Sequence, residues 1–132
     1  RRTQVINDLL EEKIAWHSGE METAQCMAHD ESCVHMDRAK AHTAHAPEWL
    51  GPEFAKTDGV PTVIFQGTEN IFIPMEHHEY VEDATIGDPF LASKEKGEKI
   101  FERASDNLAA FVEEVSKIKV EVKERDYDFR AY

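Results

Sequence analysis

The chain has 132 residues, enough for one domain with a modest core, and it carries a formal net charge of −12 at pH 7. This acidity argues against binding to nucleic acid or to anionic membrane surfaces, because phosphate contacts need a basic surface. No apolar run approaches the roughly 20 residues of a membrane-spanning helix. Acidic residues interrupt the N-terminal segment, so it is not a signal peptide, and we expect a cytoplasmic protein.

The two cysteines, Cys26 and Cys33, are seven residues apart. On one helix they would lie about 10 Å apart along the axis, which is too far for a disulfide. We therefore expect buried free thiols in a reducing compartment. The chain opens on Arg1-Arg2 without an initiator methionine, which suggests a processed product, a trimmed chain or one piece of something larger.

Three stretches have the apolar spacing of amphipathic helices, at residues 4–14, 20–29 and about 94–118. The third is the most regular, and Ser93 is placed to cap its first turn. Its apolar stripe consists of Ile100, Phe101, Ala104, Leu108, Phe111, Val112, Val115 and Ile118.

Residues 60–66 form a β-branched and aromatic run bounded by glycines and predict a strand, and residues 70–74 predict a second, shorter one. Asp88 precedes a proline, which disfavours helix and indicates a turn. From Lys119 onward the chain predicts an edge strand or an arm, unless it is a frayed tail. The aromatic residues that could anchor such an arm to another subunit are Tyr127, Phe129 and Tyr132.

The stretch W-H-S-G-E-M-E-T-A brings a histidine, carboxylates and a hydroxyl together. Gly19 allows a sharp turn, Ser18 can cap a helix, and Glu20 falls in the first helical turn with Glu22. This arrangement places the His17 imidazole on a loop tip beside the Glu22 carboxylate, a proton donor beside an anionic ligand or base. The alternative is a helix start with ordinary acidic capping.

Two further stretches contain histidines that could bind metal. His42 and His45 are three apart, but no acidic or cysteine partner has a matching spacing, so a solvated loop is expected. The later stretch, which includes His77, is expected to be a polar loop with solvated histidines that could still line a pocket. Its possible ligands are Glu76, His78 and Asp83.

Two stretches together resemble the creatininase (creatinine amidohydrolase) family. Residues 17–24, H-S-G-E-M-E-T-A, are similar to the family's H-x-G-x-x-E-T-S, with Ala24 in place of the last serine. Residues 86–97 are similar to its G-D-P-x-x-A-x-x-E-K-G, which precedes a C-terminal helix. Residues 34–39 also resemble the segment that follows the first motif. The resemblance covers residues 16 to about 116.

The resemblance implies a three-layer α/β fold with a mainly parallel sheet. The family's E-x-H…D and G-H-x-x-N ligand motifs lie in its N-terminal half, and neither stands upstream of His17. Glu76-x-His78 imitates the first motif but follows the histidine motif instead of preceding it. Residues 1–132 would thus be the C-terminal portion of the domain, completed by a partner chain within a higher oligomer, and would not fold stably alone.

Family members are metal-dependent hydrolases of non-peptide C–N bonds, largely cyclic amides and formamides. Two divalent ions, with zinc, manganese and iron all possible, hold a hydroxide that attacks the carbonyl. By resemblance His17 protonates the leaving nitrogen and Glu22 lies at the metal centre. We therefore expect a subunit of an amidohydrolase. The alternatives are a non-catalytic structural or regulatory subunit and, less favoured, an unrelated acidic helical binding module.

Overall fold

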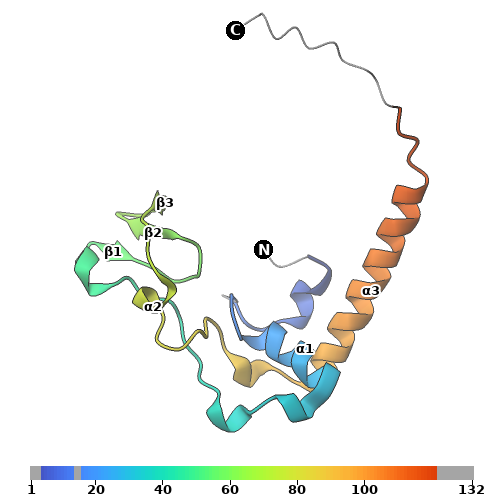
Figure 1. Cartoon of the computed structure of the whole chain (residues 1–132), viewed down its shortest axis with the longest axis horizontal. Helices are drawn as coiled ribbons and strands as arrows, with labels where there is room; N and C mark the ends of the chain where they lie inside the picture. The colour runs from blue at the N-terminus through green and yellow to red at the C-terminus, as the bar shows by residue number, and fades with distance from the viewer. Residues whose placement is uncertain (1–3, 14–15, 122–132) are drawn as a thin grey trace, which may run out of the picture.

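The computed structural model describes residues 4–13 and 16–121. The expected C-terminal arm starts at Lys119, where residues 119–121 form no strand, and its aromatic residues Tyr127, Phe129 and Tyr132 lie outside the described ranges. The α-helices described are α1 (Glu20–Asp30), α2 (His77–Tyr80) and α3 (Lys94–Ser116), and the strands are β1 (Phe54–Ala55), β2 (Thr62–Phe65) and β3 (Thr68–Phe72). Short 3-10 helices connect them: η1 (Gln4–Leu9), η2 (Glu31–Cys33), η3 (Met36–Arg38), η4 (Glu48–Leu50) and η5 (Pro89–Leu91). Figure 1 shows the small sheet on one side, α3 on the other, and α1 packed at the base of α3.

The described part of the chain is mixed α/β, but its sheet is antiparallel, in the order β1-β2-β3. The prediction of a mainly parallel sheet is therefore wrong for these strands. β2 and β3 are joined by a two-residue turn at Gln66 and Gly67, whose φ angles are 48° and 82°. Such a turn matches the twist of a hairpin, whereas parallel strands need a long crossover connection.

The first predicted helix, residues 4–14, is also wrong in type and extent. The segment forms the 3-10 helix η1, which ends at Leu9. Its buried residue, Ile6, packs with Ala24 of α1 and Ile100 of α3 in one small core. The backbone N–H groups of Glu11 and Glu12 then leave the helical pattern, because they donate to a side chain of α1.

The two longer helices match their predictions. α1 covers the stretch predicted at 20–29, with Ala24 fully buried. At the start of α3 the Ser93 hydroxyl accepts a hydrogen bond from the Lys96 N–H at 3.2 Å, so the predicted cap is confirmed. Gly97 lets the helices meet, because a Cβ there would lie 1.9 Å from the Ala24 carbonyl oxygen.

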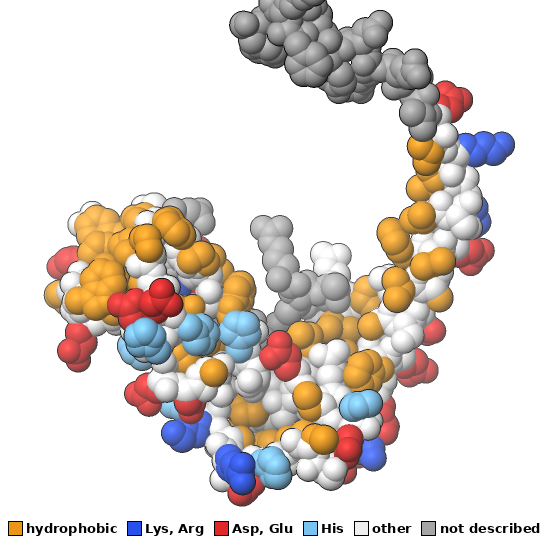
Figure 2. All heavy atoms as spheres, in the orientation of Figure 1, with side chains coloured by type: hydrophobic (Ala, Val, Ile, Leu, Met, Phe, Trp, Pro, Cys, Tyr) orange, Lys and Arg blue, Asp and Glu red, His pale blue; other side chains and the backbone are white. Residues whose placement is uncertain are grey.

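Beyond Ile100 the apolar stripe of α3 is uncovered by the described residues. Leu108, Phe111 and Ile118 are each about 60–64% exposed. Figure 2 shows these apolar side chains along the edge of α3 that faces the sheet across the open side of the molecule. A contiguous exposed apolar surface of this kind marks an interaction site.

Both cysteines are free and exposed, so the prediction of buried thiols is wrong. Cys26 stands two residues beyond Ala24, which turns its side chain away from the buried face of α1. Cys33 lies in η2, where its thiol donates to Asp30 Oδ2 at 3.5 Å. No helix in the described ranges is long and apolar enough to cross a membrane.

Candidate functional site

The loop that carries the histidine, residues 16–19, is called the motif loop here. The backbone N–H groups of Trp16 and His17 both donate to the Ile86 carbonyl, at 2.9 and 3.2 Å. The Ile86 N–H donates back to the His17 carbonyl at 2.9 Å, and Ile86 is fully buried. His17 is therefore tethered by its backbone to one of the most buried residues of the fold.

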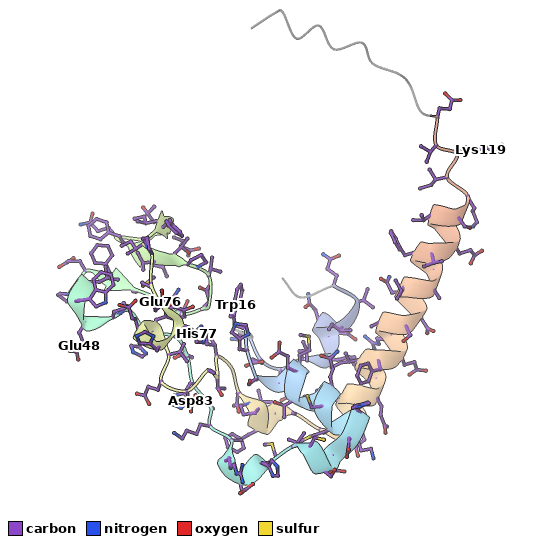
Figure 3. All side chains as sticks on the ribbon, viewed as in Figure 1. Trp16, Glu48, Glu76, His77, Asp83 and Lys119 are labelled. Atoms are coloured by element: carbon purple, nitrogen blue, oxygen red, sulfur yellow. The ribbon has the colours of Figure 1, made fainter. Side chains whose placement is uncertain are left out.

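Trp16 ties the motif loop to the segment that precedes β2. A Cβ on Gly59 would lie 1.9 Å from the Trp16 indole, so the ring occupies the space that the glycine leaves open. Figure 3 shows Trp16 on the side of the motif loop that faces His77 and the sheet. The loop is held on this side by packing as well as by hydrogen bonds.

The Glu12 carboxylate lies directly beneath the motif loop. It accepts hydrogen bonds from the Glu20 N–H at 3.0 Å and from the Asp88 N–H at 2.5 Å, and the residue is only 7% exposed. A Cβ on Gly19 would lie 2.7 Å from both of its oxygens, and one on Gly87 would lie 2.2 Å from Oε1. The glycines of the two motifs thus make room for one buried acid.

Glu12, and not Ser18, caps α1. The N-cap residue is Gly19, which has no side chain. The N–H of the next residue, Glu20, donates to the Glu12 carboxylate. The prediction that Ser18 caps this helix is therefore wrong. A carboxylate at a helix N-terminus satisfies free N–H groups and is stabilised by the helix dipole.

Glu20 accepts hydrogen bonds from the segment that contains Glu12, just as Glu12 accepts one from the Glu20 N–H. Its fully buried carboxylate accepts from the N–H groups of Glu11 and Glu12, at 2.9 and 2.7 Å, and from the Lys96 ammonium. Burial alone would raise the pKa of Glu20, but the hydrogen bonds from Lys96, Glu12 and Glu11 outweigh it and hold the pKa below its ordinary value of 4.5. Lys96 also donates to the Leu91 carbonyl at 2.8 Å.

Glu22, the second predicted site residue, is exposed and turns back onto the motif loop. Its Oε2 accepts from the Ser18 N–H at 2.6 Å, while the Thr23 hydroxyl donates to the Ser18 carbonyl at 3.3 Å. Ser18 has a positive φ of 52°, which a non-glycine residue adopts only at a cost. Glu22 and Thr23 therefore hold the loop conformation that presents His17.

The His17 side chain is exposed and meets two other rings edge-on. Ring centroids lie 6.2 Å apart for Trp16 and 5.6 Å apart for His77. His77 Nδ1 is 3.0 Å from the Tyr80 hydroxyl. The stretch predicted as a polar loop thus contains α2, whose first residue contacts the predicted proton donor.

The other candidate ligands do not gather into a metal site. In residues 4–13 and 16–121 no group of three or more histidine, cysteine, aspartate and glutamate side chains is arranged to hold an ion. Glu76 and Glu79 form a capping box on α2, and His78 is exposed. Asp83 Oδ2 lies 3.2 Å from His42 Nε2 and 3.6 Å from Lys40 Nζ.

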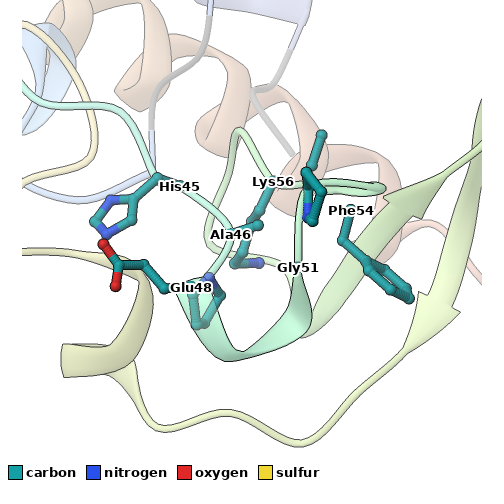
Figure 4. Close-up of a pocket in the computed structure, with 9 residues that line it drawn as sticks. His45, Ala46, Glu48, Gly51, Phe54 and Lys56 are labelled. Carbon is teal, nitrogen blue, oxygen red and sulfur yellow. The ribbon is translucent and has the colours of Figure 1, made fainter.

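His45 is separated from His42 and lines a cavity of about 490 Å³ with Glu48 and Lys56 (Figure 4). Burial lowers the pKa of Lys56 from its ordinary value of 10.5. Its ammonium donates to the carbonyls of Val60 and Thr62 and lies 4.5 Å from the centre of the Tyr80 ring. The predicted solvated loop therefore contributes to a structured wall.

A protein-family model described as creatinine amidohydrolase matches residues 2–112. This chain belongs to the creatininase family. Comparison with the curated proteins and with the solved structures found no match. Creatininase membership implies an amidohydrolase-type function, and enzymes of this family bind metals.

Sequence reasoning missed the buried acids of this creatininase chain. The sequence gives no reason to single out Glu12 and places Glu20 only in the first turn of a helix, because both stand among other charged residues. The available signal was the glycine of each motif: Gly19 and Gly87 leave space that a nearby side chain must fill. The other signal was Lys96, a cation next to Gly97 that can pair with a buried acid.

We predict that Gly87→Ala destabilises the motif loop more than Gly51→Ala destabilises its own turn. Both glycines have positive φ, 153° and 82°, so each substitution carries a backbone cost of about 1–3 kcal/mol. Only at Gly87 would the Cβ also collide with its surroundings, which are the Glu12 carboxylate and the Gly19 Cα, adding about 1–3 kcal/mol. Urea unfolding of the two variants measures the difference, and equal losses would contradict the Glu12 arrangement.

Proposed function

We propose that this creatininase-family chain is a subunit of an amidohydrolase that cleaves a non-peptide C–N bond of a cyclic amide or formamide. In this proposal His17 gives its proton to the leaving nitrogen. The observation that carries the proposal is the exposed His17 ring on a loop fixed from several sides: Ile86 by hydrogen bonds, Gly59 by packing against Trp16, and Glu22 through Ser18.

Amide cleavage explains why such a residue is needed. Once a nucleophile has added to the carbonyl carbon, the C–N bond breaks only if the nitrogen takes up a proton, because an amide anion is a very poor leaving group. An imidazole is suited to this transfer near neutral pH. It must also be held close to the nitrogen, since a donor that is free to wander loses the advantage of proximity.

The metals of the family require ligands beyond those described here. Since the described residues form no three-ligand group, we propose that the divalent ions, zinc, manganese or iron, are held mainly by residues of a partner chain. Bound metal would polarise the carbonyl of the substrate. We propose that Glu22, which is exposed beside the motif loop, lies at the edge of that centre.

We further propose that residues 1–132 are the C-terminal portion of the domain and that a second chain carries the N-terminal half. The uncovered stripe of α3 supports this. Burying apolar side chains as large as Leu108 and Phe111 against another apolar surface removes them from water, which is favourable. Among the described elements α3 packs mainly against α1 and η1 and not against the sheet.

For the complex, we predict that His17→Ala lowers turnover of a cyclic amide such as creatinine by about 10²–10⁴-fold. Metal content and melting temperature should stay near wild type, because the His17 side chain is exposed and its backbone makes the tethering contacts. His78→Ala is the matched control, since His78 is exposed on the neighbouring α2 helix.

Other outcomes of the same measurements separate the alternatives. Full activity of His17→Ala with normal folding would identify the chain as a non-catalytic structural or regulatory subunit. A lowered melting temperature with unchanged activity of the folded fraction would make the motif structural. Glu22→Gln keeps shape and removes charge; if its metal content and activity are both unchanged, Glu22 has no place at the metal centre.

The partner proposal predicts that Phe111→Asp abolishes assembly with the second chain. Phe111 is 61% exposed, so its loss removes little packing within the chain, but a charge there would be buried in the interface. Ala110→Asp, outside the apolar stripe, is the control. Co-purification of tagged chain with its partner measures the effect, and normal assembly of Phe111→Asp would contradict the proposal.

A further inference from the structure

We propose that His77 and Tyr80 are positioning residues that hold the His17 ring in the orientation needed for proton transfer. The catalytic part of this inference rests on the proposed function, whereas the positioning itself is a property of the chain and is measured separately. Nothing in the family motifs includes either residue, and both come from the stretch E-H-H-E-Y, which the function did not otherwise use.

The contacts form a continuous series from the sheet to the candidate donor. The Lys56 ammonium is fixed by the carbonyls on either side of the turn into β2 and lies over the Tyr80 ring. Tyr80 is 7% exposed, and its hydroxyl is 3.0 Å from His77 Nδ1. The His77 ring then meets the His17 ring edge-on, at a centroid distance of 5.6 Å and an interplanar angle of 60°.

Burial decreases along the series from Lys56 to His17. Lys56 and Tyr80 are buried, His77 is half-buried, and His17 is exposed. His77 and Tyr80 are three residues apart on α2, a spacing that places both on one face of a helical turn. The rigid end of the series is therefore the sheet and its turn, and the end that needs support is His17.

The contact with His77 restricts rotation of the His17 ring, which the backbone hydrogen bonds do not fix. Hydrogen bonds to Ile86 fix the main chain of His17 but not the rotation of its ring, and the last torsion of a histidine side chain is broad. Contact with the edge of a second ring restricts that rotation. The Tyr80 hydroxyl in turn engages one nitrogen of His77, which fixes the supporting ring.

Figure 3 shows His77 beside Trp16, on the sheet side of the motif loop. The His17 ring is thus flanked by Trp16 from its own chain neighbour and by His77 from α2. The His17 side chain stays exposed between these two rings, so a substrate nitrogen could receive a proton from it.

The test uses the assembled protein, in which this full chain carries ¹³C-labelled histidine, and follows the ring signals by NMR. His77→Ala should shift and broaden the His17 ring signals, because the neighbouring ring that restricts it is gone. Tyr80→Phe keeps the ring beneath Lys56 but removes the hydroxyl, so it should shift first the His77 signals and, more weakly, those of His17. His78→Ala, the control on the same turn, should leave the His17 signals unchanged.

In the assembled enzyme, His77→Ala should lower kcat by roughly tenfold to a hundredfold at unchanged KM, as expected for a misplaced donor. His77→Phe, which keeps a ring against His17, should recover part of that loss. A purely structural role would not give this recovery, nor would it separate kcat from KM.

Unchanged His17 signals in His77→Ala would overturn the inference, whatever the activity. If His77→Ala changes the His17 signals but His17→Ala keeps full activity, the positioning stands and the proposed function is wrong. An unchanged kcat in His77→Ala, in an enzyme that His17→Ala inactivates, would overturn the catalytic part of the inference alone. The spectra and the kinetics therefore assign each failure to its own claim.

Discussion

Two buried glutamates that cap each other's segments are the constraint on which the rest of this structure depends. The Glu12 carboxylate satisfies the start of α1, and the Glu20 carboxylate satisfies the turn that contains Glu12. A buried charge is costly unless it is paired and hydrogen-bonded, and here the donors include backbone N–H groups and the Lys96 ammonium. The reciprocal arrangement fixes the ends of the segment that carries His17.

This polar pair stands between two small apolar cores that would otherwise be separate. One contains Ile6, Ala24 and Ile100, and the other is centred on Tyr80 and Ile86. Glu12 reaches both, since it accepts from the first residue of α1 and from Asp88 beside Ile86. A chain with so little apolar core leaves the stripe of α3 for another surface, in agreement with the proposed partner.

The spacing of residues along the chain predicted the elements that depend on interactions between near neighbours. The spacing of apolar residues gave α1, α3 and the strand that contains Val63, and Ser93 was recognisable as a cap. The pattern failed where side chains capture backbone groups outside their own segment: the N–H groups of Glu11 and Glu12 donate to Glu20 instead of continuing a helix, and Glu12 accepts from Asp88 across 76 residues. The parallel sheet was wrong because the resemblance described a whole family fold, whereas the turn at Gly67 dictates a hairpin. The motif predicts His17 and Glu22 as site residues, whereas the contact of His77 with His17 could not be predicted from spacing, because it depends on the fold.

Hydrogen–deuterium exchange at the backbone amides of Glu12, Glu20 and Asp88 tests the central claim most directly, because each of these N–H groups donates to a glutamate side chain. The account predicts that they exchange slowly, together with the interior amides of α1, although they lie at a helix start and in turns. If all three exchange as fast as the amides of exposed turns, the carboxylates do not hold the motif loop, and the account of how His17 is presented is wrong.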